Sequence, residues 1–201
     1  MAMPVPHHDY WTAADLDDMS EDGLRYEVLN GQLVVYAAPK PRHQLLIQRL
    51  VRVLVDAAPT DLLVLDGVGV IIGDDEPIPD AMVVTGGVDL DGRGVPVAQV
   101  GLVVEVVSKS TTMTDRVVKP IMYSTAGIAS YWRFEINPFA GQFPGEQLPV
   151  LFAYRLGLDG EYEQTHRVAA GDTADLRVPF PVTITPVSLL PWQGLLTGPA
   201  G

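Results

Sequence analysis

Two acidic side chains stand in parts of the chain that are otherwise strongly apolar. Glu105 lies inside residues 102–107, where the other residues are Leu and Val. Asp80 follows Pro79 and begins the apolar run at residues 81–84. An ionised carboxylate in such a strand is costly to bury unless a cation compensates it, and a metal ion is among the strongest compensating groups. An ion pair with an Arg, or a place at an exposed edge, would also explain Glu105 taken alone.

Taken together, Asp80 and Glu105 form a more specific pattern than either does alone. One acid stands at a strand entrance and the other inside a second strand, so the two can face each other within reach of one metal ion. Carboxylate oxygens suit Mg²⁺, which keeps several waters and so leaves room for a substrate phosphate. Such a site supports metal-assisted phosphodiester hydrolysis, which needs a polarised phosphoryl oxygen, an activated water and a nearby cation.

The elements that would position these acids follow from hydrophobic periodicity and turn residues. A short helix is expected over residues 12–19, with Thr12 as its N-cap. Asn30-Gly31 predicts a tight turn between strands at 26–29 and 33–36. Apolar residues at helical spacing predict a helix over 42–58, which Pro59 ends. A second helix is expected within 114–126, with Gly127 just after its end.

The remaining segments read mainly as strands. Runs rich in Val and Ile predict strands at 62–65, 68–72, 81–85, 100–107, 131–136 and 182–185. Residues 150–156 and 162–168 predict a hairpin that turns at Asp159-Gly160. The order of elements does not follow a regular βαβ alternation, so we expect an α/β (α+β) fold with helices flanking a central mixed sheet and a C-terminal hairpin.

Length and composition favour one folded domain over residues 1–201. Its core is expected at about 12–136 and its C-terminal strands at about 148–190, with 1–10 disordered. Hydrophobic residues make up 47% of the chain and charged residues 19%, which excludes wholesale disorder. The absence of Cys excludes a thiolate nucleophile and a Cys-based metal site. No signal peptide or apolar run long enough for a bilayer is present, so we expect a soluble cytoplasmic protein without membrane contact.

Charge is distributed unevenly along the chain. The formal net charge of −12 argues against nonspecific coating of nucleic acid, which needs clustered cations. One segment nevertheless carries four bases and no acid: Lys40, Arg42, Arg49 and Arg52. A looser basic group follows later: Lys109, Arg116, Lys119 and Arg133. A basic cleft on an acidic body and an ordinary solvated helix face both fit this pattern.

An ordered set of motifs resembles a known family. Pro79-Asp80 is followed by Val104-Glu105-Val106-Val107-Ser108, then by Asp115-x-x-x-Lys119-x-x-x-Tyr123-x-x-Ala126-Gly127-Ile128 and Tyr131-Trp132. Upstream lie the hairpin Tyr26-Glu27-Val28-Leu29-Asn30-Gly31 and the helix entrance Lys40-Pro41-Arg42-His43-Gln44. Over about residues 12–135 this set resembles the Uma-two family of the PD-(D/E)XK nuclease superfamily, which has a restriction-endonuclease-like fold.

The resemblance implies a metal-dependent endonuclease that acts on DNA with Mg²⁺ or Mn²⁺. Asp80 and Glu105 would hold the metal, helped by the main-chain carbonyl of Val106. Lys119 would orient or deprotonate the attacking water and stabilise developing phosphoryl charge. Glu27 would complete the site through a water. A homodimer is also implied, because two sites are needed to cut both strands of a duplex.

Three further residues are candidates for phosphate contacts. His43 matches a family position at the start of the first long helix, where it would either contact phosphate or serve packing. Ser108 and Lys109 lie in the loop after Glu105. That loop is polar, so capping of the following helix would explain Ser108 equally well. The isolated histidines His7, His8 and His166 are better explained as tail and surface residues.

The chain departs from the family pattern at three positions. Val107 stands two residues after the second acid, where the superfamily normally has its lysine, and in the Uma-two pattern this role moves to Lys119. Lys109 stands where a Pro is common and is the alternative catalytic cation. Pro120 lacks an N–H and disfavours α geometry at Lys119, so the helix is expected to begin or bend there.

Two other classes of function stay open. A catalytically inactive binding or scaffold module with the same fold would explain the net charge and Val107. A metal-dependent phosphoesterase acting on a nucleotide or small phosphate ester would use the same acids on a different substrate.

Overall fold

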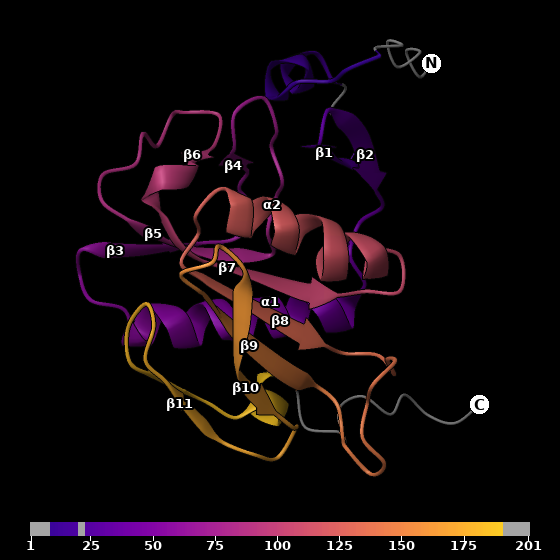
Figure 1. The fold of residues 1–201 in the computed structure, drawn as a ribbon, viewed down its shortest axis with the longest axis vertical. Helices are drawn as coiled ribbons and strands as arrows, with labels where there is room; N and C mark the ends of the chain where they lie inside the picture. Colours follow the sequence, from indigo (N-terminus) through magenta and orange to yellow (C-terminus); the bar gives the residue numbers. More distant parts are fainter. Residues whose placement is uncertain (1–8, 20–22, 191–201) are drawn as a thin grey trace.

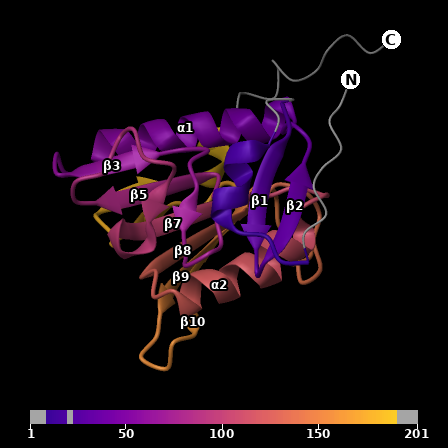
Figure 2. The same ribbon diagram turned by 90° about the horizontal axis from the view of Figure 1, so that it is seen from above.

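The structure is a computed structural model that describes residues 9–19 and 23–190. A central sheet lies between two helices, and Figure 2 shows α1 (Pro41–Ala57) along one face and α2 (Lys119–Thr125) along the other. The hairpin β1 (Arg25–Leu29) and β2 (Gln32–Tyr36) stands at one end of the sheet. The predictions for residues 1–10, His7 and His8 fall almost wholly outside the described residues.

Six strands form the central sheet, in the order β10, β9, β8, β7, β5 and β3. Their bounds are β10 (Tyr162–Val168), β9 (Val150–Leu156), β8 (Ser130–Glu135), β7 (Val100–Val107), β5 (Ala81–Thr85) and β3 (Leu62–Leu65). β7 and β8 are parallel, and every other neighbouring pair is antiparallel. The predicted mixed sheet with flanking helices and a C-terminal hairpin is therefore confirmed.

Shorter elements surround this sheet. β11 (Ala174–Leu176) pairs with β12 (Val182–Ile184), and β4 (Val70–Ile71) pairs with β6 (Val95–Pro96). Figure 1 shows the β9–β11 region at the opposite end of the molecule from β1 and β2. Three 3-10 segments complete the list: η1 (Ala13–Asp18), η2 (Val97–Gln99) and η4 (Pro186–Leu189).

Two details of the predicted strands were wrong. The strand expected at 68–72 is reduced to Val70–Ile71, and it pairs with β6 outside the central sheet. Neither β6 nor β11 was predicted, because two or three residues are too few to show an alternating pattern. The predicted turn at Asn30-Gly31 is confirmed, with φ of 51° and 71° at these residues, the left-handed geometry that an Asn-Gly hairpin turn requires.

Both faces of the central sheet are buried. Leu46, Leu50 and Leu54 recur every four residues on α1 and are fully buried in the core between that helix and the sheet. Tyr123 and Tyr131 lie in a second core, on the face that α2 covers. In the part of the chain that the structure describes, no helix is long and apolar enough to cross a bilayer.

Strand alternation decides on which face the two acids lie. Along β5, Ala81 and Val83 belong to the α1 core, whereas Met82 and Val84 belong to the α2 core. Asp80 differs from Met82 by two positions and therefore shares its face. The same rule puts Glu105 with Val103, on the α2 face. Because Ala81 is paired with Val104, the two acids are neighbours across β5 and β7.

The helix that carries Lys119 contains an irregular turn. Residues Thr114–Val118 form a π-helical segment, η3, which runs directly into α2. The N–H of Lys119 bonds to the carbonyl of Thr114, five residues back, and Lys119 itself has α geometry (φ −62°, ψ −43°). The hydroxyl of Tyr131 donates to the Asp115 carbonyl, which an α-helix would have used for Lys119. The helix thus passes through Pro120, and the irregularity takes the form of this wider turn just before the proline.

Truncation of Leu50 to Ala should destabilise the fold strongly. Leu50 is fully buried between α1 and the sheet, so Leu50→Ala leaves a cavity and should lower the free energy of unfolding by about 2–5 kcal/mol. Leu63→Ala on β3 is the control, because Leu63 is 41% exposed. Urea unfolding followed by circular dichroism measures both. Equal effects of the two substitutions would contradict the assigned core.

Candidate active site

Asp80 and Glu105 lie together at the edge of one pocket of about 470 Å³. Oδ2 of Asp80 accepts a hydrogen bond from the N–H of Val106 at 2.7 Å, and the N–H of Asp80 donates to the Val104 carbonyl at 3.0 Å. These bonds fix the acid against β7. Asp80 is only 7% exposed and Glu105 only 2%, so both carboxylates are largely removed from bulk water.

Lys119 reaches the same place from α2. Its Nζ lies 3.2 Å from Oε1 of Glu105, and 3.2 Å and 3.0 Å from the two carboxylate oxygens of Glu27. It also donates to the Ile78 carbonyl at 3.0 Å. The side chain is buried, so the ammonium is held by protein acceptors. Burial alone would lower the pKa of Lys119, but Glu105 and Glu27 raise it well above its ordinary value.

The N-terminal hairpin contributes one acidic and one basic side chain to the site. Glu27 and Arg25 are two positions apart on β1 and so lie on the same face. Nε of Arg25 is 3.4 Å from Glu27, and its Nη1 is 3.5 Å from Oδ1 of Asp80. The guanidinium also donates to the carbonyls of Ile78 and Pro79. Arg25 therefore ties the hairpin to the strand entrance that holds Asp80.

Two more buried side chains orient the acids. The hydroxyl of Tyr123 donates to Oε1 of Glu105 at 2.7 Å. Nε2 of His43 is 2.8 Å from the Val106 carbonyl and 3.3 Å from Oδ2 of Asp80. Burial alone would lower the pKa of His43, but its hydrogen bond to Asp80 and the charge of that acid raise it. His43 thus contacts protein groups at the site.

Exposed cations lie around the pocket mouth. Lys40, Arg42 and Lys109 line the pocket and are exposed to solvent. The half-buried Ser108 lines it as well, and its hydroxyl lies 3.0 Å from those of Ser110 and Thr111. Positive charge at the rim and acids within would attract a phosphate group and a cation to adjacent positions.

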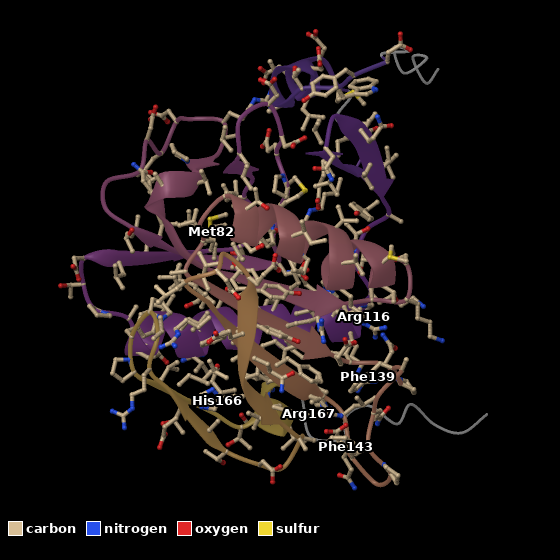
Figure 3. The ribbon with its side chains drawn as sticks, in the orientation of Figure 1. Met82, Arg116, Phe139, Phe143, His166 and Arg167 are labelled. Atoms are coloured by element: carbon tan, nitrogen blue, oxygen red, sulfur yellow. The ribbon has the colours of Figure 1, made fainter. Side chains whose placement is uncertain are left out.

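Other members of the two basic groups lie elsewhere. Arg116 makes two hydrogen bonds to the buried Glu135, at 2.8 Å and 2.7 Å. Figure 3 shows Arg116 near Phe139, with Arg167 and Phe143 farther along the same side. The guanidinium of Arg167 stacks on Phe143 and pairs with Glu146. Arg116 therefore ties η3 to the end of β8, and Arg167 holds the loop after β8 against β10.

Acids outnumber bases in the interior of the site. Four buried carboxylates line the pocket: Glu27, Asp80, Glu105 and Asp115. Lys119 and Arg25 are the full cations beside them, so the group carries surplus negative charge when all four acids are ionised. Burial raises the pKa of Glu105 well above its ordinary value, and burial raises that of Asp115 to about 7. Burial alone would raise the pKa of Asp80, but His43 and Arg25 lower it.

This donor set fits one hard divalent cation. Asp80 and Glu105 offer carboxylate oxygens, and Val106, whose N–H donates to Asp80, has a carbonyl that lies 2.8 Å from Nε2 of His43. Within residues 9–19 and 23–190 no group of three or more His, Asp or Glu side chains has the arrangement of a metal cluster. Mg²⁺ does not require such a cluster, because it commonly binds one or two carboxylates and keeps several waters. The surplus negative charge is the further feature that a dication would neutralise.

The structure brings together the residues that the sequence indicated for the site. Asp80, Glu105, Lys119 and Glu27 contact one another or a shared neighbour. His43, Ser108 and Lys109 line the same pocket, and Val106 contacts Asp80 through its N–H. Sequence reasoning gave no role to Arg25, Asp115 or Tyr123. Two signals could have found the first two: Arg25 is two residues from Glu27 in a strand, and Asp115 is four residues from Lys119 in a helix.

The chain resembles a known protein family and a solved structure. The family model described as "Uma2: Putative restriction endonuclease" matches residues 13–191. A solved structure from Anabaena variabilis ATCC 29413, described as a "putative nuclease belonging to DUF820", has a TM-score of 0.61 with this chain. The alignment covers 84% of this chain and 89% of that one at 17% identity, which shows a shared fold. The expected restriction-endonuclease-like fold is thereby confirmed. None of the curated proteins matches the chain.

The buried Asp115 should make stability depend on pH. Its pKa of about 7 exceeds its ordinary value of 3.8, so the folded state holds the proton more tightly than the unfolded chain. This contribution to stability is complete below pH 3.8 and is lost as pH rises through about 7. Asp115→Asn cannot lose a proton, so it should gain stability relative to the wild type over this range, by roughly 4 kcal/mol at most.

Urea unfolding in metal-free buffer between pH 4 and pH 8 measures this difference. Asp91→Asn, in an exposed turn, is the control for removal of one formal charge. A stability difference between Asp115→Asn and the wild type that stays constant with pH would show that the carboxyl is not protonated in the folded protein.

Proposed function

The chain belongs to the Uma2 family, and from that premise we propose that it is a metal-dependent endonuclease that hydrolyses phosphodiester bonds of DNA. The main observation that supports the proposal is that Asp80, Glu105 and Lys119 all line one pocket. Two acids from neighbouring strands and a lysine from the following helix supply the charges that phosphodiester hydrolysis requires. Exposed cations at the pocket mouth add a place for the substrate backbone.

Asp80, Glu105 and the Val106 carbonyl are the groups that would hold Mg²⁺ or Mn²⁺. When bound, the ion would polarise a phosphoryl oxygen and make a water more acidic. Lys119 keeps its proton, because Glu105 and Glu27 raise its pKa. It therefore serves to orient the substrate and to stabilise negative charge that develops on the phosphoryl oxygens. Arg25 holds Asp80 in place, and Tyr123 does the same for Glu105.

DNA suits the distribution of charge around the pocket. The chain as a whole carries −12, which disfavours broad adhesion to a polyanion. Lys40, Arg42 and Lys109 at the mouth give a local positive region that can contact phosphates next to the scissile bond. His43 and Ser108 lie close enough to the pocket to assist. A homodimer would present two such sites to the two strands of a duplex.

A catalytically inactive module is the second candidate function. It is favoured by the basic side chains that already contact the two acids: Arg25 and His43 contact Asp80, and Lys119 contacts Glu105. A site in which protein cations already neutralise the acids could persist without a metal ion. Metal binding separates the two functions.

Metal binding should depend on both acids. Isothermal titration calorimetry with Mg²⁺ and with Mn²⁺ should detect one site in the wild type, and Asp80→Asn or Glu105→Gln should weaken it at least about 10-fold. Glu163→Gln, on the exposed face of β10, is the matched control. A wild-type protein that binds neither ion would favour the inactive module.

DNA cleavage should require the same residues. Plasmid, linear duplex and single-stranded DNA are incubated with Mg²⁺ or Mn²⁺, and parallel reactions contain EDTA. Cleavage should stop in EDTA and fall at least about 100-fold in Asp80→Asn, Glu105→Gln and Lys119→Met. Glu163→Gln should cut at the wild-type rate. Cleavage that persists in Asp80→Asn would contradict the assignment of Asp80 to the active site. Hydrolysis of small phosphate esters without cleavage of DNA would indicate a phosphoesterase.

A further inference from the structure

Phosphodiester hydrolysis needs a group that accepts the proton of the attacking water. Lys119 is unsuited to this role, because the geometry keeps it protonated. Its Nζ lies within 3.0–3.2 Å of Glu27, Glu105 and the Ile78 carbonyl, and an ammonium has three hydrogens to donate. Burial among these acceptors leaves Lys119 a fixed positive charge, so a different residue must be the base.

Three of the four pocket carboxylates are engaged with other groups. Asp80 accepts from the N–H of Val106 and lies beside His43 and Arg25. Glu105 accepts from Tyr123 and contacts Lys119. Glu27 contacts both Lys119 and Arg25. Each of these three carboxylates already contacts at least one cation of the protein.

Asp115 differs from these three acids. It lines the same pocket and is only 3% exposed. Among the residues that the structure describes, no Lys, Arg or His lies within ion-pair distance of its carboxylate. The N–H of Asp115 donates to the Thr111 carbonyl at 2.8 Å. Lys119 influences the carboxylate through space and favours the ionised form, whereas burial and the acids Asp80 and Glu27 favour the protonated form.

Asp115 and Lys119 reach the pocket from the same helical segment. The π-helical segment Thr114–Val118 has more residues per turn than an α-helix, so residues four or five apart come to lie on one face. Asp115 and Lys119 are four apart, and both line the pocket. The bond from Tyr131 to the Asp115 carbonyl holds this wider turn in place. A single irregular helix thus supplies both the Asp115 carboxyl group and the Lys119 ammonium to the pocket.

We propose that Asp115 is the general base of the reaction, an assignment that rests on the proposed nuclease function. The water oxygen forms a bond to phosphorus while its proton passes to the Asp115 carboxylate. The bond from phosphorus to the leaving sugar oxygen breaks with its electron pair, and that oxygen takes a proton from solvent. Lys119 stays protonated throughout and stabilises the charge on the phosphoryl oxygens. A carboxyl group whose pKa lies at about 7 suits proton transfer near neutral pH.

The groups around Asp115 influence the pKa of its carboxyl group. The charged and titratable groups around it come from β1, β2, the residue before β5, β7, β8, α1, η3 and α2. They are Glu27, Tyr36, Asp80, Glu105, Tyr131, His43, Arg116, Lys119 and Tyr123. Burial and the acids Asp80 and Glu27 favour the protonated form. Lys119 is the strongest opposing influence.

The test compares Asp115→Asn and Asp115→Glu with the wild type. Steady-state cleavage of one DNA substrate with Mn²⁺ should give a kcat about 100-fold lower in Asp115→Asn, with KM unchanged. The wild-type kcat should rise with pH up to about 7, and this rise should be absent in Asp115→Asn. Asp115→Glu keeps a carboxylate and should recover at least 10-fold over Asp115→Asn. Asp91→Asn is the matched control and should behave as the wild type.

Calorimetry with Mn²⁺ distinguishes a base from a ligand. Asp115→Asn should bind Mn²⁺ within threefold of the wild type, and its circular dichroism spectrum should be unchanged. A kcat that equals the wild-type value, or the loss of Mn²⁺ binding, would overturn the assignment. A wild-type protein that neither binds Mn²⁺ nor cuts DNA would instead refute the nuclease function on which this assignment rests.

Discussion

The placement of one ammonium group among buried carboxylates is the constraint around which the rest of the site is built. Lys119 contacts acids from β1 and β7 and a carbonyl from the segment before β5, so a single nitrogen joins four parts of the fold. Removing that many charges from water is costly unless each is paired. The hairpin, the two sheet strands and the helix must therefore pack in one relative arrangement, because a small displacement of any of them would leave a buried charge without its partner.

Much of the fold could be predicted because its signals are local. Asn30-Gly31 specifies a hairpin turn, and the four-residue spacing of Leu46, Leu50 and Leu54 specifies a helix face. The run at residues 100–107 is long and apolar enough to indicate a strand that is buried on both sides. The two-residue strand β6 could not be predicted, and β4 was predicted too long, because the two pair with each other across more than twenty residues and neither carries an alternating pattern.

The sequence indicates a site residue most clearly where a charged residue stands among apolar ones. Asp80 and Glu105 stand out because they are charged within apolar strands, and Lys119 and Glu27 were identified through the family motifs. Arg25 and Asp115 carry only weak signals, their spacing from Glu27 and from Lys119, since an Arg in an edge hairpin and an Asp in a helix are ordinary in sequence. Their burial is created by tertiary packing. The sequence predicts only part of the effect of Pro120, because a proline next to Lys119 indicates an irregular helix without saying of which kind. In the structure the Tyr131 hydroxyl donates to the Asp115 carbonyl, and the helix continues through a π turn instead of ending.

The origin of the lysine in α2, rather than in β7, has a consequence for how such chains are recognised. Val107 occupies the strand position and stays in the apolar interior, while the ammonium arrives from a separate element. An ammonium beside two buried acids is thus not bound to one position in the sequence. A search for two acids followed at once by a lysine would pass over this chain, whereas a search for where charged atoms lie in three dimensions would detect it.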